Sequence, residues 1–152
     1  MLGLTFYKWQ SDIIQMIQLN PDPRKIYWFW DSKGRTGKTS LAKHICLRYP
    51  NTIYLNGCSR DVLFAVSKRL EEKDIDIAIF GLSRQDANGI SYKSLEILKD
   101  GIGFSGKYES GMFLSNSMHV IVFANFAPDL DMLSIDRWEI LNIAAGEVAP
   151  PD

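Results

Sequence analysis

The sequence predicts an α/β fold: a mostly parallel, five-stranded β-sheet with helices on both faces. Short apolar segments rich in β-branched and aromatic residues alternate with amphipathic segments, as strands and helices do in such a fold. The apolar segments are continuous rather than alternating in polarity, which is typical of parallel strands buried on both faces. The 152 residues are enough for one three-layer core of this kind.

The expected elements follow one another along the whole chain. Apolar residues between positions 4 and 17 recur at helical spacing, until an Asn-Pro-Asp-Pro sequence ends the helix. The strands are expected at residues 25–30, 52–55, 75–80, 119–124 and 139–143. The helices between them are expected at residues 39–48, 61–72 and 92–100. Residues 101–113 predict a β-hairpin with Gly106 at or near its tip.

Composition and charge narrow the classes of function. The 17 basic and 18 acidic residues give a formal net charge of -1, so any DNA contact has to come from a local basic loop. The apolar runs are far too short for a membrane span, and the N-terminus lacks the features of a signal peptide. Cys46 and Cys58 show neither a disulfide pattern nor metal-ligand spacing, so we expect both to be reduced and buried, as in an intracellular protein.

The strongest functional signal is the segment Asp-Ser-Lys-Gly-Arg-Thr-Gly-Lys-Thr at residues 31–39, between an expected strand and helix. It matches the phosphate-binding P-loop (Walker A) pattern at Gly37, Lys38 and Thr39, while Ser32 stands where the first glycine is expected. Backbone N–H groups of such a loop surround the phosphates. Lys38 is expected to reach the β- and γ-phosphates, and the Thr39 hydroxyl is expected to ligate Mg²⁺. The residues expected around the nucleotide are Ser32, Lys33, Gly34, Arg35, Thr36, Gly37, Lys38, Thr39 and Ser40.

Further segments narrow the choice among P-loop proteins. They are residues 79–84 (Ile-Phe-Gly-Leu-Ser-Arg), 98–109 (Leu-Lys-Asp-Gly-Ile-Gly-Phe-Ser-Gly-Lys-Tyr-Glu), 119–125 (His-Val-Ile-Val-Phe-Ala-Asn) and 136–138 (Asp-Arg-Trp). In this order the chain resembles the superfamily 3 helicase domain of the replication initiator (Rep) proteins of circular single-stranded DNA viruses, satellites and plasmids. The resemblance implies an AAA+-like P-loop NTPase that uses ATP and Mg²⁺. It also implies a homo-oligomeric ring, usually a hexamer, acting on single-stranded DNA.

The resemblance implies roles for particular residues. Lys38, Asn125 and Arg137 would be catalytic: Asn125 positions the attacking water, and Arg137 is an arginine finger that enters the neighbouring subunit's site. Lys107 and Tyr108, on the expected hairpin, would contact single-stranded DNA. Lys99, by contrast, is interpreted as a cation that favours the end of its helix.

The pattern departs from the family where Mg²⁺ and its water are held. The acidic Walker B residue should follow the third apolar strand, but Gly81 stands there. Asp76 lies too early, whereas Asp86 could reach the metal from a loop. Because one lost electrostatic group commonly lowers the rate about 10²–10³-fold, hydrolysis is doubtful and binding is the safer expectation.

The domain expectations follow from the same comparison. We expect an N-terminal helical segment at residues 1–24, which could be the remnant of an oligomerisation segment, an ATPase core at 25–145 and a flexible tail at 146–152. The nuclease domain that normally precedes the core, with its His-x-His site, is not expected here, so we predict no DNA nicking. The chain looks like an excised fragment or a stand-alone descendant, in a host nucleus if viral and in cytoplasm if plasmid-derived.

The sequence therefore leaves three candidate functions. The first is an ATP-dependent helicase domain acting on single-stranded DNA. The second is a non-hydrolysing nucleotide-binding or assembly module, favoured by Gly81. The third is a small-molecule P-loop kinase, disfavoured because no lid-like arginine cluster lies between the later strands.

Overall fold

The computed structural model describes residues 6–34, 36–104 and 111–143. Its main sheet has five strands in the order β2-β3-β6-β1-β7, and all four pairings between neighbouring strands are parallel. The strands are β1 (Ile26–Trp30), β2 (Thr52–Asn56), β3 (Ile77–Leu82), β6 (His119–Ala124) and β7 (Trp138–Asn142). The predicted α/β class and the five-stranded parallel sheet are confirmed.

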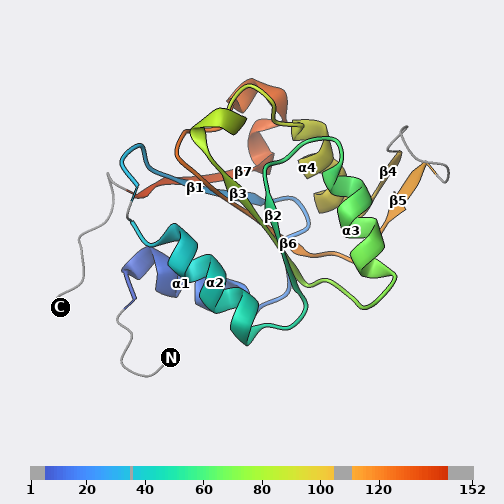
Figure 1. Ribbon diagram of the computed structural model, residues 1–152, viewed down its shortest axis with the longest axis horizontal. Helices are drawn as coiled ribbons and strands as arrows, with labels where there is room; N and C mark the ends of the chain where they lie inside the picture. The colour runs from blue at the N-terminus through green and yellow to red at the C-terminus, as the bar shows by residue number, and fades with distance from the viewer. Residues whose placement is uncertain (1–5, 35, 105–110, 144–152) are drawn as a thin grey trace.

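Helices cover both faces of this sheet, in two pairs (Figure 1). The pair on one face is α1 (Lys8–Met16) and α2 (Lys38–Arg48), and the pair on the other is α3 (Val62–Leu70) and α4 (Tyr92–Asp100). Successive strand residues point to opposite faces. Trp28 accordingly packs with α3 and α4, whereas Phe29 packs with α1 and α2.

The helix α1 packs against the sheet through its apolar face. Trp9 and Ile13 are almost completely buried, and the Trp9 ring lies 5.9 Å from that of Phe29 and 6.1 Å from that of Phe123. The apolar face of this helix is therefore used within the chain. The expected tail at 146–152 lies outside the described residues.

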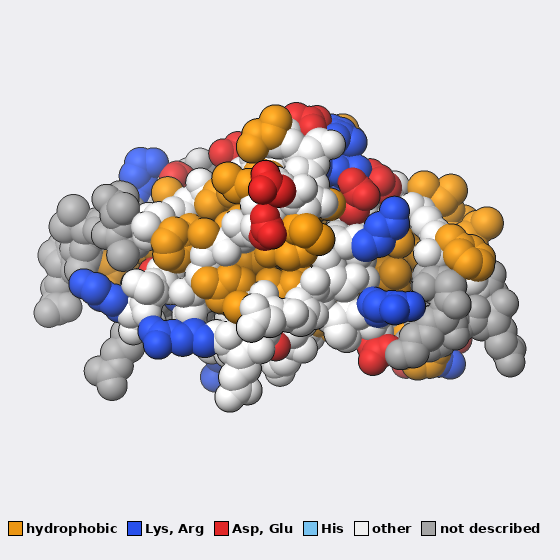
Figure 2. All heavy atoms as spheres, turned by 90° about the horizontal axis from the view of Figure 1, so that it is seen from above, with side chains coloured by type: hydrophobic (Ala, Val, Ile, Leu, Met, Phe, Trp, Pro, Cys, Tyr) orange, Lys and Arg blue, Asp and Glu red, His pale blue; other side chains and the backbone are white. Residues whose placement is uncertain are grey.

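The predicted hairpin is present as β4 (Ile102–Phe104) and β5 (Met112–Leu114), which pair in antiparallel fashion, while Gly106 lies outside the described residues. Gly101 precedes it with a positive φ of 74°, and a Cβ there would lie 2.6 Å from the carbonyl oxygen of Ser115. Phe113 is buried, but the opposite face of the hairpin exposes Ile102, Phe104, Met112 and Leu114. Figure 2 shows hydrophobic side chains gathered at the right of the molecule, where the hairpin lies.

Two expectations about single side chains can be compared with the structure. Lys99 lies in the last turn of α4, as expected, where it is buried and its Nζ donates to the carbonyl oxygen of Met118 at 2.8 Å. Burial lowers its pKa to about 8, and the neighbouring Arg137 adds to that effect. Both cysteines are free, and Cys58 is buried as expected, whereas Cys46 is only partly buried.

Candidate nucleotide-binding site

The predicted P-loop connects the end of β1 to the start of α2, at the carboxyl edge of the sheet. Gly37 is the N-cap of α2 with a φ of 94°, and a Cβ there would lie 2.6 Å from the Gln10 side-chain nitrogen. That nitrogen, which belongs to α1, donates to the Gly37 carbonyl at 3.0 Å. The left-handed backbone therefore favours glycine here, and a larger residue would also have to displace the Gln10 amide. The first N–H groups of α2 have no partner within the helix, which makes this end a natural anion site.

Inside the loop lies a carboxylate to which the sequence alone assigned no role. Asp31, directly after β1, has no solvent exposure. Its Oδ1 accepts from the backbone N–H groups of Lys33 (3.0 Å) and Gly34 (2.5 Å). Its Oδ2 accepts from the Thr36 hydroxyl at 2.5 Å and forms an ion pair with the Lys38 ammonium. Burial alone would raise the pKa of this carboxyl, but the bonds from Lys38, Thr36 and Gly34 together hold it below its ordinary value.

A pocket of about 240 Å³ opens beside the loop. Three predicted residues line it: Lys38 and Thr39 from the start of α2, and Asn125 directly after β6. The structure thus brings together side chains that are distant in the sequence. The rest of the lining comes from seven residues without a predicted binding role, namely Ala42, Tyr54, Asn56, Gly81, Leu82, Ser83 and Phe123.

The side chain of Tyr54 lies against Gly81, the position where the sequence analysis expected an acidic Walker B residue. A Cβ built on Gly81 would lie 2.0 Å from the Tyr54 hydroxyl oxygen and 2.8 Å from its Cζ. The tyrosine comes from β2, next to β3 in the sheet. A neutral phenol therefore stands in the pocket where the sequence analysis expected a carboxylate.

Asp86, the alternative metal ligand, makes other contacts. Its Oδ2 accepts from the backbone N–H of Ser83 at 2.7 Å and from the Ser83 hydroxyl at 3.1 Å, which caps the 3₁₀ turn Arg84–Asp86. It does not line the pocket. In the described part of the chain, no group of three His, Cys, Asp or Glu side chains could hold a metal ion. A metal-binding role for Asp86 stays a prediction.

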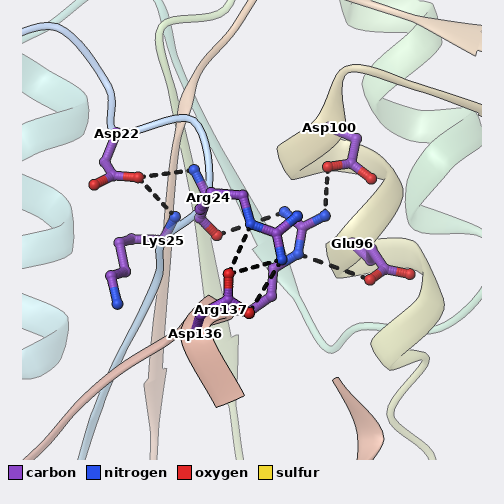
Figure 3. Close-up of polar contacts among 7 residues, drawn as sticks. All are labelled: Asp22, Arg24, Lys25, Glu96, Asp100, Asp136 and Arg137. Carbon is purple, nitrogen blue, oxygen red and sulfur yellow. Dashed lines mark hydrogen bonds and ion pairs between the residues drawn. The ribbon is translucent and has the colours of Figure 1, made fainter. Parts of the chain in front are cut away.

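Arg137 lies at the opposite edge of the sheet, since it directly precedes β7 and parallel strands begin together. It is 2% exposed, and Figure 3 shows its guanidinium directed at α4, where Nη2 lies 2.5 Å from Asp100 and Nε lies 3.7 Å from Glu96. Its neighbour Asp136 forms a separate ion pair with Arg24. The arginine-finger role stays a prediction, and it would require these contacts to open.

The remaining predicted residues divide into two groups. Ser32, Lys33, Thr39 and Ser40 are exposed at the loop, and the Ser32 carbonyl accepts from the Arg84 guanidinium at 2.6 Å. Arg35, Lys107 and Tyr108 lie outside the described residues. Arg84 and Gln10 hold the loop from other elements, and no sequence signal marks either contact.

Comparison with known proteins points to one class, since the curated relatives of this chain are replication proteins of viruses and satellites. The Para-Rep C2 protein of Subterranean clover stunt C2 alphasatellite is 34% identical over 135 residues, which are 88% of this chain and 46% of that protein. The master replication protein of Faba bean necrotic yellows virus (isolate Syrian SV292-88) is 34% identical over 129 residues, which are 85% of this chain and 43% of that protein. The Para-Rep C9 protein of Faba bean necrotic yellows C9 alphasatellite is 28% identical over 138 residues, which are 90% of this chain and 48% of that protein.

The chain therefore spans about half the length of the curated relatives it matches. No family model matches it, and no solved structure matches it. Among the described residues, no helix has the length and apolar character that crossing a membrane requires.

Proposed function

We propose that this chain binds ATP with Mg²⁺ as the P-loop domain of a Rep-type replication protein. The supporting observation is that Lys38, Thr39 and Asn125 line one pocket at the carboxyl edge of a parallel sheet. This edge is where ligands bind in open α/β sheets. The relatives, which are named as replication proteins, support the same biological setting.

The test of binding is a calorimetric titration with ATP and Mg²⁺. Lys38→Ala should abolish binding, because it removes the ammonium expected on the β- and γ-phosphates. Lys43→Ala is the matched control, since Lys43 is an exposed lysine on the same helix. Equal affinity of the natural chain and Lys38→Ala would refute the assignment.

We further propose that the domain acts on single-stranded DNA as a homo-oligomeric ring, with hydrolysis coupled to strand movement. The predicted DNA residues are Lys107 and Tyr108. ATP hydrolysis measured with and without single-stranded DNA, together with the solution mass, tests both parts. Lys107→Ala should reduce the slope of log affinity against log salt by about one unit per contact. DNA-independent turnover by a monomer would contradict this proposal.

A second candidate is a nucleotide-binding module that does not hydrolyse ATP, and it is favoured by the contact between Gly81 and Tyr54. A neutral phenol cannot supply the negative charge that holds Mg²⁺ and its water. Thr39 and the phosphates would then be the remaining ligands. Phosphate release by the natural chain at about 1 s⁻¹, within the range of ordinary enzymes, would exclude this candidate.

A further inference from the structure

The interior of the P-loop already contains an anion that belongs to the chain itself. The carboxylate of Asp31 accepts two backbone N–H groups and one hydroxyl of the loop, and it pairs with the Lys38 ammonium. These four donors lie within five residues of one another and converge on a side chain that is fully buried. The loop is thus closed on its own carboxylate.

The donor types are those that a bound phosphate requires. P-loops hold phosphate oxygens with backbone N–H groups and with the lysine ammonium. A carboxylate and a phosphate are both anionic acceptors that form short, charge-assisted hydrogen bonds with these groups. The Lys38 ammonium cannot keep full contact with Asp31 while it reaches toward the β- and γ-phosphates. The two anions therefore compete for it.

We propose that Asp31 determines the affinity of the nucleotide site: its carboxylate holds the Lys38 ammonium in the free loop, and a nucleotide has to draw this ammonium away from it. This inference rests on the proposed function. After displacement, Asp31 keeps its bonds to the N–H groups of Lys33 and Gly34 and to the Thr36 hydroxyl. The loop thus retains its shape while the ammonium moves to the phosphates.

The opposite hypothesis is that Asp31 only shapes the loop. An aspartate that accepts N–H groups two and three residues ahead is a common turn-forming arrangement. In that case its replacement would disorder the loop and weaken nucleotide binding. The two hypotheses predict changes of opposite sign, so one variant separates them.

The experiment is a calorimetric titration of the natural chain and of Asp31→Asn with ATP and Mg²⁺. Asparagine keeps an oxygen for the two N–H groups but removes the charge that competes for Lys38. We expect Asp31→Asn to bind at least about 10-fold more tightly, because a charge-assisted bond no longer has to be broken. Asp74→Asn, which makes the same change at an exposed position, should leave the affinity unaltered.

Unchanged or weaker binding by Asp31→Asn, with binding by the natural chain intact, overturns the role of Asp31 and leaves the proposed function standing. Absence of nucleotide binding in the natural chain and in every Asp31 variant overturns both. Asp31→Ser, which is smaller and also uncharged, serves if Asp31→Asn does not fold.

A measurement on the natural chain needs no variant. The carboxyl ¹³C resonance of Asp31 should move when ATP and Mg²⁺ saturate the site, because the ammonium leaves this carboxylate. The resonance of Asp74 should stay in place. An unchanged Asp31 resonance in the saturated protein would show that the carboxylate is not displaced and would overturn the inference.

Discussion

An acidic residue at position 81 should destabilise the fold unless Tyr54 is changed as well. A Cβ at this position would lie 2.0 Å from the Tyr54 hydroxyl oxygen, far inside van der Waals contact. Tyr54 is 39% exposed, so its ring can turn outward, but only by giving up its packing in the pocket. Forcing extra atoms into such a space costs about 1–3 kcal/mol. Gly81→Asp alone should therefore destabilise the fold by about that amount.

A double-mutant cycle measures this steric coupling. Urea unfolding of the natural chain, Gly81→Asp, Tyr54→Ala and the double variant should give an interaction free energy of about 1–3 kcal/mol, because the smaller residue removes the clash. Gly89 is the matched control, since a Cβ there meets nothing closer than 4.0 Å. Gly89→Asp and Tyr54→Ala should be additive. Additivity of Gly81→Asp and Tyr54→Ala would refute the steric argument.

The same double variant tests the chemistry. If the loss of the acid limits hydrolysis, Gly81→Asp with Tyr54→Ala should release phosphate about 10²–10³-fold faster than the natural chain. The single Tyr54→Ala variant controls for the opened pocket. A double variant no faster than Tyr54→Ala would mean that Gly81 is not the limiting defect.

Three more predictions concern buried charges. The pKa of Asp31 is lowered in the folded chain from the ordinary value of 3.8. Its contribution to the free energy of unfolding is therefore present above pH 3.8 and is lost as the pH falls through the folded-state pKa. Urea unfolding at acidic pH should show this loss in the natural chain but not in Asp31→Asn. The pKa of Lys99 is lowered from 10.5 to about 8. As the pH rises from about 8 to 10.5, the natural chain should therefore gain stability relative to Lys99→Met. Urea unfolding at alkaline pH measures this gain. Arg137→Met should destabilise the isolated chain by about 1–3 kcal/mol, because it breaks the pairs with α4; an unchanged urea midpoint would contradict this.

The last prediction affects how the arginine-finger hypothesis is tested. An Arg137 variant that loses activity could do so because the fold is weakened at α4 and β7, not because a neighbouring site lacks a guanidinium. Arg137→Lys does not separate these causes, since lysine cannot reproduce the planar contacts with Asp100 and Glu96. A mixture of two variants separates these causes. If Arg137 acts in a neighbouring subunit's site, mixing an Arg137 variant with Lys38→Ala should restore activity only at interfaces where an intact Lys38 meets an intact Arg137.

Local sequence patterns predicted the fold well because its elements are regular. The β1 segment is apolar on both faces, and Trp28 and Phe29 pack on opposite sides of the sheet as period-2 alternation requires. The C-terminal end of α4 was predictable from Gly101, whose left-handed conformation ends the helix. The position of the P-loop between β1 and α2 was predictable because its spacing pattern lies within one local turn.

The contacts that were not predictable join segments far apart in the chain. Nothing near Arg137 in the sequence shows that it will be buried against α4, and its charge alone favours the surface. The close approach to Gly81 was partly predictable, because a glycine within a strand often marks a place where another group comes near the backbone. The identity of that group, Tyr54 of β2, depends on which strands become neighbours.

Two features of the site, the glycine at position 81 and the carboxylate of Asp31, have a common electrostatic consequence. At Gly81 the pocket lacks a carboxylate beside the expected metal position, and at Asp31 the loop contains one beside the expected phosphate position. The first change weakens the attraction for Mg²⁺, and the second adds a negative charge where the phosphates bring more. Both changes disfavour the ATP–Mg²⁺ complex, so Asp31→Asn combined with Gly81→Asp and Tyr54→Ala should bind this complex more tightly than Asp31→Asn alone. Calorimetry with and without Mg²⁺ checks the reasoning, because the added gain should vanish when the metal is withheld.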